Sequence, residues 1–397
     1  MAMKKRQKKL VIGLSCLLAV VIAGGATAAV LLNREDKKAP ETSWSEVMAD
    51  NTLPQIESEN FGFSTSGTLI KIPDVEALST FKVNQEVNTR EDIEQKLPEI
   101  AEIVFGDLFK STKISFEDFI SGGFEGSLSE SKDNDSYNVR LSSDNSFIAY
   151  KTSTVAHSSM TGKPVDISRL DDAEPLSDRA YEMGTEPYTM QQALALCVDM
   201  MDKLTPYLDS LEYKPTRVIV FERDDMQGHA FRVEFSAYKN DVPLHDSSVT
   251  GQLIEDSNIK LNSHCVYMLI TEPDVIGAVC RCTGADLIEE KKIENGYITL
   301  SEATELLADY YAPLYKHIIE EVSIEYVIAD KLKTITLDEE GLEGLEVSVV
   351  DSSVVEPYWC FRIEDTPESN YENAYCREEQ KIFVNMLTGK VYTYHNS

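Results

Sequence analysis

The amino-acid sequence predicts an α+β protein, with an N-terminal transmembrane helix followed by tandem modules of a helix packed on an antiparallel sheet. Three observations predict this class. The segment Leu10–Leu32 contains no charged residue. Two later segments, Thr189–Leu204 and Thr299–Leu314, share one helical pattern of apolar residues. Sequence typical of β-strands follows each of these two segments.

Leu10–Leu32 is long enough to cross a bilayer as a helix. Five basic residues precede it, and basic residues remain on the cytoplasmic side. We therefore expect a cytoplasmic basic tail at residues 1–9, a transmembrane anchor at 10–32, and a single-pass cell-membrane protein whose C-terminal domain is extracellular. The alternative is a cleaved signal segment, because Ala26-Thr27-Ala28 fits an A-x-A cleavage site.

Residues 33–60 are polar and predict a stalk that separates the folded part from the membrane. Beyond residue 32 the chain has 32 basic and 68 acidic residues, a net charge near −36. Such a surface repels polyanions, so the sequence predicts no nucleic-acid partner.

Residues 61–187 are expected to form a diverged N-terminal α+β module. Thr89 and Asp92 have the spacing of a capping box and should open a helix. Pro98 lies inside this helical pattern, so a break or kink is expected there. The segment Tyr137–Lys151 predicts a β-hairpin.

Residues 188–290 and 291–397 are expected to form two further modules, the second resembling the family described below. The pattern predicts that Thr189–Leu204 and Thr299–Leu314 are helices, each opened by a capping box. Seven apolar positions coincide between them at an offset of 110 residues and lie on one helical face.

Two nearly identical tetrapeptides follow these helices at similar positions. They are Phe231–Glu234 and Phe361–Glu364. Together with the two helices, they predict that the modules are repeats of one fold.

The C-terminal segment Lys381–Tyr394 predicts a strand, a turn and a second strand. With Asn385, Thr388 and Gly389 in its turn, it resembles the (D/N)xxTG hairpin of PepSY-like modules in exported Gram-positive proteins. Tyr238–Leu244 is similar to a Tyr-x-Asn-x-x-Pro segment of related modules. The resemblance implies a helix packed on an antiparallel sheet and a binding role, either restraining a peptidase or modulating an envelope sensor. It implies no catalytic residue.

The cysteines leave the disulfide state open. Ser263–Ile270 and Ile276–Cys282 predict a hairpin whose turn contains Glu272-Pro273-Asp274. Within a hairpin, the numbers of two opposed residues have a constant sum that defines the register. A sum of 547 puts Cys265 opposite Cys282, and a sum of 545 puts Cys265 opposite Cys280. Either a disulfide or reduced, buried thiols would fit. The six cysteines beyond the apolar segment are Cys197, Cys265, Cys280, Cys282, Cys360 and Cys376.

No established catalytic or nucleotide-binding motif occurs, so the sequence predicts no catalytic residue and no cofactor. Two candidate metal sites were weighed. Asp133-Asn134-Asp135 begins like a calcium loop but lacks its later ligands, which favours a polar turn. His264, Cys265, Cys280 and Cys282 are zinc-ligand types, but their spacing matches no standard site. The sequence therefore predicts no metal site.

We expect a membrane-anchored, extracytoplasmic binding or regulatory protein that is not an enzyme and has a protein partner in the cell envelope. One alternative is a hydrolase of unfamiliar type that uses carboxylates. It requires a pocket in which carboxylates with shifted pKa values converge. The other alternative is a structural surface spacer, which requires no groove.

Overall fold

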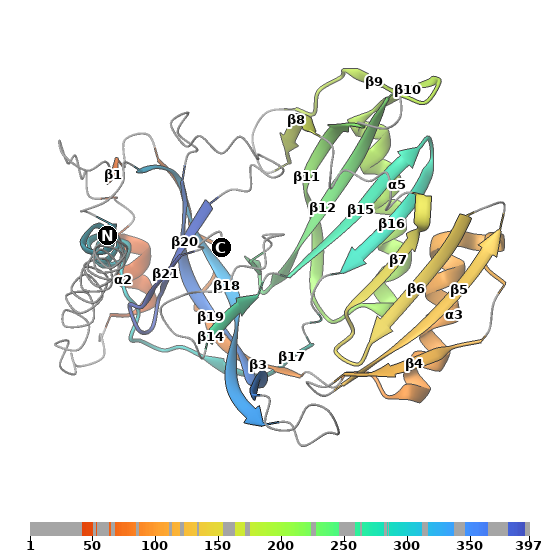
Figure 1. Cartoon of the computed structure of the whole chain (residues 1–397). Helices are drawn as coiled ribbons and strands as arrows, with labels where there is room; N and C mark the ends of the chain where they lie inside the picture. The colour runs from red at the N-terminus through yellow and green to blue at the C-terminus, as the bar shows by residue number, and fades with distance from the viewer. Residues whose placement is uncertain are drawn as a thin grey trace, which may run out of the picture. The chain divides into compact units, whose positions relative to one another are not determined.

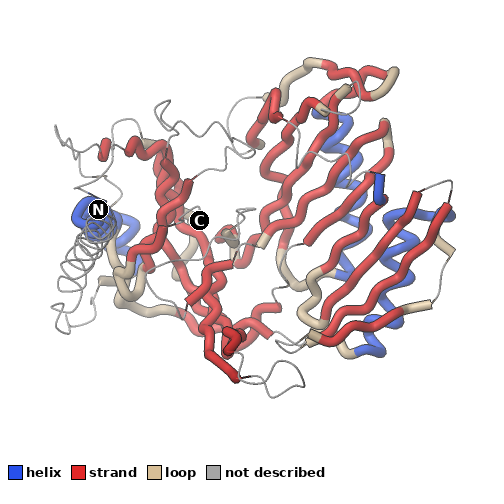
Figure 2. Tube along the Cα trace, viewed as in Figure 1, coloured by secondary structure: helices blue, strands red, loops and turns tan. Residues whose placement is uncertain are grey.

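The computed structural model shows a chain built mainly from β-strands (Figures 1 and 2). Four α-helices accompany the strands over the described residues, and Thr42–Ser397 forms one compact unit. The structure describes residues 42–50, 53, 63–64, 68–84, 87–110, 113–119, 123–132, 135–153, 163–170, 175–223, 228–245, 259–262, 264–281, 284, 286–311, 317–336, 346–363 and 380–393.

The larger sheet has ten strands in the order β4-β5-β6-β7-β16-β15-β12-β11-β8, with β13 paired to β12. All of its strand pairs are antiparallel. Its strands are β4 (Ser115–Asp118), β5 (Phe124–Lys132), β6 (Asp135–Ser142), β7 (Phe147–Lys151), β8 (Lys163–Arg169), β11 (Glu212–Glu222), β12 (His229–Lys239), β13 (Val242–Pro243), β15 (Cys265–Glu272) and β16 (Val275–Arg281). A separate hairpin joins β9 (Ala180–Met183) to β10 (Glu186–Thr189).

Two helices, α3 (Arg90–Phe105) and α5 (Met190–Leu204), cover one face of this sheet (Figure 2). Their apolar faces pack on alternate strand residues such as Val218, Val233 and Val266, all fully buried. The predicted capping boxes at the starts of both helices are confirmed. Of the break or kink expected at Pro98, the break does not occur, because α3 continues through that residue.

The second sheet has nine strands and is dominated by two long ones, β18 and β19. The helices α2 (Trp44–Ala49) and α6 (Leu300–Tyr311) contribute Trp44, Leu300 and Leu307 to its core. Its strands are β1 (Phe63–Ser64), β2 (Leu69–Lys71), β3 (Ser79–Asn84), β14 (Ile259–Asn262), β17 (Asp286–Lys292), β18 (His317–Thr336), β19 (Glu346–Ile363), β20 (Gln380–Asn385) and β21 (Val391–Thr393). Helix α2 lies within the range predicted as a stalk, and Trp44 donates its indole N–H to the Val75 carbonyl at 2.6 Å.

Each of the helices α3, α5 and α6 is followed along the chain by a group of β-strands. Helix α3 precedes β4 to β7, α5 precedes β11, β12, β15 and β16, and α6 precedes β18 to β21. Phe231–Glu234 lies on the second strand after α5, and Phe361–Ile363 lies on the second strand after α6. The two tetrapeptides therefore occupy equivalent places in the order of elements.

The predicted fold class is nevertheless wrong. The described chain is mostly β-sheet, and the expected modules do not each form a sheet of their own. The ranges 61–187 and 188–290 share the ten-stranded sheet, because β7 pairs with β16 and β8 pairs with β11. Pairing between the strands of the two ranges satisfies backbone groups that an unpaired edge strand would expose. This explains why the two ranges form one sheet.

The structure gives no support to the predicted membrane anchor or to the membrane localisation derived from it. Leu10–Leu32 lies outside the described residues. Within the part that is described, no helix is both long and apolar enough to span a bilayer.

The hairpin of β15 and β16 confirms one of the two predicted registers. Val266 is opposite Arg281 and Tyr267 is opposite Cys280, so opposed numbers sum to 547 near the strand ends. Cys282 lies outside the described residues, so its pairing with Cys265 stays a prediction. Cys197 and Cys360 are free, buried thiols.

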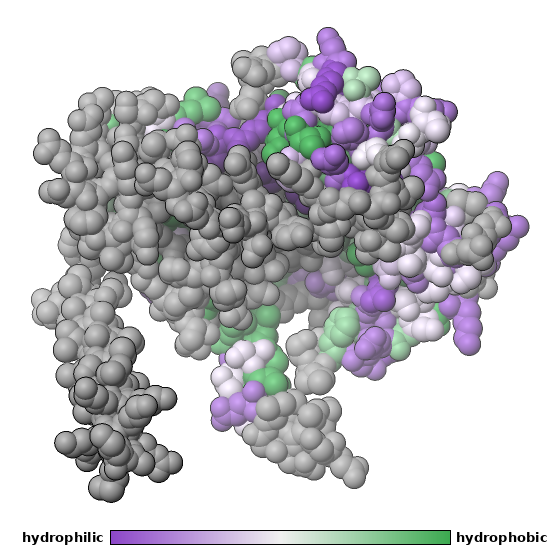
Figure 3. Space-filling model, turned by 45° about the horizontal axis from the view of Figure 1, so that its top comes forward, coloured by the Kyte–Doolittle hydropathy of each residue, from purple (hydrophilic) through white to green (hydrophobic). Residues whose placement is uncertain are grey.

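The two sheets meet where β13 ends. Leu244 bridges to Tyr326 of β18, and the His245 N–H donates to the Tyr326 carbonyl at 2.8 Å. After an intervening segment, β14 pairs with β18 as well. In the space-filling view, hydrophilic residues dominate the described surface, with hydrophobic residues in small patches (Figure 3).

Candidate anion-binding cleft

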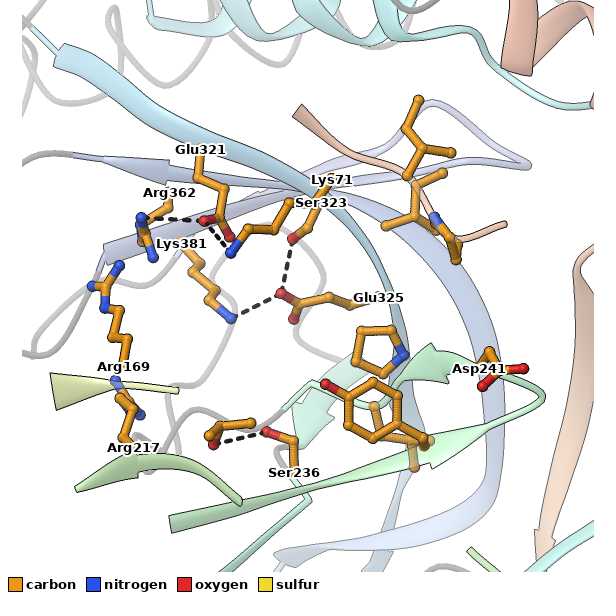
Figure 4. Close-up of a pocket in the computed structure, with 17 residues that line it drawn as sticks. Lys71, Arg169, Arg217, Ser236, Asp241, Glu321, Ser323, Glu325, Arg362 and Lys381 are labelled. Atoms are coloured by element: carbon orange, nitrogen blue, oxygen red, sulfur yellow. Dashed lines mark hydrogen bonds and ion pairs between the residues drawn. The ribbon is translucent and has the colours of Figure 1, made fainter. Parts of the chain in front are cut away.

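A cavity of about 280 Å³ lies between the two sheets (Figure 4). On one side it is lined by β8, β11 and β12, and on the other by β2, β18, β19 and β20. We call this cavity the cleft.

Strand alternation explains why polar side chains line the cleft. Successive residues of a strand point to opposite faces. On β18, Val322 and Ile324 lie in the apolar core, so Glu321, Ser323 and Glu325 lie on the other face. Arg217 of β11, Arg362 of β19 and Lys381 of β20 also line the cleft, and each is followed by a residue that lies in an apolar core: Val218, Ile363 and Ile382.

Cations outnumber carboxylates in the cleft lining. The carboxylates are Asp241, Glu321 and Glu325. The cations are Lys71, Arg169, Arg217, Arg362 and Lys381. The complete chain carries a net charge of −31, so this local excess of positive charge runs against the character of the whole protein.

Arg169 and Arg217 are directly opposed on neighbouring strands. Directly opposed residues point to the same face of a sheet, and like charges in such a pair destabilise it. Glu234, which is 5% exposed, lies 2.6 Å from Arg217 and 2.6 Å from Arg232. Two arginines thus lie side by side at the cleft, with the buried Glu234 as a counterion of Arg217.

Glu325 is a buried counterion within the cleft. Its Oε1 lies 2.9 Å from Lys381 Nζ and accepts the Ser323 hydroxyl at 3.0 Å, while Oε2 lies 2.9 Å from His245 Nδ1. Burial raises the pKa of Glu325, but the charge of Lys381 and the contact with His245 outweigh it and hold that pKa well below its ordinary value. Glu325 therefore stays ionised at neutral pH.

Glu321, also on β18, is likewise paired with two cations. It lies 2.9 Å from Lys71 Nζ and 3.2 Å from Arg362 Nη2, and Arg362 also lies 3.3 Å from Glu320. These pairs hold Lys71 and Arg362 at the cleft wall (Figure 4).

The cleft also has an apolar part. Tyr238, Pro243 and Leu244 belong to β12, β13 and the residue after them, and all three line the cavity. Asp241 of the same connection lies across the cleft from Arg169, Arg217 and Arg362 in Figure 4. Ile72 and Pro73 also line the cavity.

Of the candidate zinc ligands, His264, Cys265 and Cys280 do not line the cleft, and Cys282 lies outside the described residues. His264 is buried, with Nε2 2.9 Å from the Tyr213 hydroxyl and 3.8 Å from Asp209. Across the described residues, no cluster of three or more His, Cys, Asp or Glu side chains has the form of a metal site. Trp359 is fully buried in the core and donates to the Ile298 carbonyl at 2.8 Å.

Sequence reasoning assigned none of the cleft side chains to a binding site, although residues of Tyr238–Leu244 and of the tetrapeptide with Arg362 line the cleft. Its cations come from strands widely separated along the chain, and no short motif joins them. One signal was present, since each repeated tetrapeptide alternates an arginine with buried apolar residues. In β19 this arginine is Arg362, which lines the cleft.

Comparison with known proteins does not extend these observations. No protein-family model matches the chain, and the searches of curated proteins and of solved structures found no match. The resemblance to PepSY-like modules therefore stays a prediction.

Proposed function

We propose that this protein is a non-enzymatic binding protein whose cleft holds an anionic group of its partner or ligand. The observation that carries the proposal is the opposed pair Arg169 and Arg217, placed beside Arg362 in a chain of strongly negative charge. Arginine's planar fork matches carboxylate and phosphate oxygens, so these side chains are suited to that chemistry. A protein partner stays part of the proposal, as the molecule that presents the anion.

The hydrolase alternative is less well supported. A carboxylate-dependent hydrolase needs a protonated acid beside an ionised base. In the cleft, Glu325 is held ionised, and Glu321 is paired with Lys71 and Arg362. Glu125, whose pKa burial raises, lies on β5 and does not line the cleft. The spacer alternative predicts a surface without a groove, and the cleft weighs against it.

The test is isothermal titration calorimetry of the full chain with sodium sulfate, sodium phosphate and sodium acetate. We expect saturable binding of at least one anion, and a loss of about tenfold or more in affinity for Arg169→Gln. The matched control is Arg140→Gln, because Arg140 is an exposed arginine of the same sheet, 3.6 Å from Glu125. If no anion binds, or if both variants lose affinity equally, the proposal is wrong.

A further inference from the structure

A shallow groove of about 440 Å³ lies along helix α5 and shares no lining residue with the cleft. Apart from Leu176, all of its lining residues belong to this helix. Gln191, Leu194, Val198 and Asp202 follow one another at spacings of three or four residues, so they lie on one flank of the helix. We call this hollow the α5 groove.

The floor of the α5 groove is apolar. Leu176, Leu194 and Val198 pack against the core that α5 shares with the ten-stranded sheet, yet they stay partly exposed, and Ala195 is exposed. Side chains four residues apart on a helix are neighbours on its surface. A partner's aliphatic side chain that covered Leu194 and Val198 would remove apolar surface of both molecules from water, which favours association.

The α5 groove also contains negative charge. The carboxylates of Asp199 and Asp202 line it, and no cation is among the described residues that do so. Asp199 is paired with Lys203 at 2.6 Å, so its charge is partly offset. Asp202 is exposed and makes no ion pair with the described part of the chain. The groove therefore joins an apolar floor to one carboxylate that is available to a cation.

Gln191 adds a hydrogen-bond acceptor to the α5 groove. Its Nε2 donates to the carbonyls of Leu176 and Ser177 at 3.2 and 3.1 Å, and these bonds fix the orientation of the side-chain amide. Its Oε1 is buried and has no donor among the described residues. A buried acceptor without a donor is unfavourable, so an N–H group that a partner brought into the groove would be stabilised there.

We propose that the α5 groove docks a short segment of a partner protein that combines aliphatic side chains with a lysine or arginine. The aliphatic side chains cover Leu194 and Val198, and the cation pairs with Asp202. The net charge of −31 favours the approach of such a basic segment and disfavours a second copy of this chain, a nucleic acid or an anionic membrane. Because the groove is separate from the cleft, this proposal does not depend on anion binding.

The test is fluorescence anisotropy of a labelled peptide titrated with the full chain. The probe is an amidated peptide that repeats Lys-Leu-Leu-Lys three times. In one control peptide serine replaces every leucine, and in the other glutamate replaces every lysine. Sodium chloride at about 150 mM screens the general attraction between the acidic chain and a basic peptide. We expect the probe to bind at least about tenfold more tightly than either control peptide, because each control lacks one of the two contacts.

Variants of the full chain locate the binding site. Ala195→Lys puts a cation at an exposed position of the groove and should weaken binding of the probe about tenfold or more. Its matched control is Gln95→Lys, because Gln95 is exposed on α3 and the change adds the same charge. Asp202→Asn should weaken the probe about threefold. Its control is Glu94→Gln, since Glu94 is also exposed on α3.

The apolar floor has its own variant and control. Val198→Ser should weaken binding of the probe about threefold or more. Val275→Ser, at a position 42% exposed on β16, should leave it unchanged. If the serine peptide binds as tightly as the probe, the apolar floor is not used and the proposal is wrong. Equal binding of the glutamate peptide would contradict the pairing with Asp202. Absence of binding by the probe, or equal losses from a groove variant and its control, would overturn the proposal.

Discussion

At the scale of single residues, buried charges are the costly feature of this fold. A charge removed from water is tolerated only where partners replace its hydration. Glu325 satisfies this condition with Lys381, His245 and Ser323. The cleft is thus built from ion pairs that hold each other in position.

Glu325 should make stability depend on pH. Its pKa in the folded protein lies below the ordinary value of 4.5, so the ionised form stabilises the fold. This contribution is present above the ordinary pKa and is lost as pH falls below it towards the folded value. Urea unfolding at pH 7, 5 and 4 should show a smaller decrease for Glu325→Gln than for the parent protein. Glu117→Gln is the control. If the free energy of unfolding falls with pH as much in Glu325→Gln as in the parent protein, the account is contradicted.

A second buried pair lies away from the cleft. The fully buried Arg281 contacts Asp209 and donates to the Asn145 carbonyl at 2.7 Å. Tyr213 donates to Asp209 at 3.1 Å, and burial raises the pKa of Tyr213, so its hydroxyl keeps the proton. Together these contacts tie the segment after α5 to β16.

Arg281→Met should therefore lower the free energy of unfolding by about 3–5 kcal/mol, because it leaves the Asp209 charge buried without its main partner. The exposed control Arg140→Met should change it by less than about 1 kcal/mol. Chemical denaturation at pH 7 measures both. A loss below about 1 kcal/mol for Arg281→Met would show that Asp209 finds another partner.

At the scale of elements, the most predictable features were those set by contacts between residues close together in the sequence. Thr189 and Thr299 begin helices as expected, because a capping box is a contact between residues three apart. The register of β15 and β16 followed from the turn at Pro273 and Asp274 for the same reason. The pairing of Phe147 with Arg281 was not predictable, since no local pattern links strands so distant in sequence.

The capping boxes that begin at Thr189 and Thr299 should contribute equally to the free energy of unfolding if they are equivalent. Thr189→Ala and Thr299→Ala should each lower the free energy of unfolding by about 1 kcal/mol. The double variant should lose about 2 kcal/mol, because the helices pack in different cores and act independently. Thermal or urea unfolding measures these changes, with Ser129→Ala as an exposed control. No loss for either threonine would mean that the capping bonds add nothing to stability.

At the scale of the whole molecule, the cleft exists because two sheets meet at Leu244 and Tyr326. Its residues could not be predicted, since each cation is one polar residue in an ordinary alternating strand. Only the assembled sheets bring Arg169, Arg217 and Arg362 to one cavity. Composition indicated the acidic surface, and that surface is what makes the basic cleft distinctive.

The acidic surface should also shape how binding responds to salt. Salt screens the repulsion between the surface and an incoming anion, but it also weakens the attraction within the cleft. Because the partly buried arginines are close to the ligand, the second effect should dominate. Affinity for the tightest-binding of sulfate, phosphate and acetate should fall as sodium chloride rises from 20 to 500 mM, measured by calorimetry. A rise over that range would place the bound anion on the exposed surface.

The most direct measurement of the central claim is the position of a bound anion. Crystals of the full chain soaked with selenate and measured at the selenium edge would locate it by anomalous scattering. The account predicts the strongest anion peak between Arg169 and Arg217, and the loss of that peak in Arg169→Gln. Strong selenate peaks found only outside the cleft would contradict it.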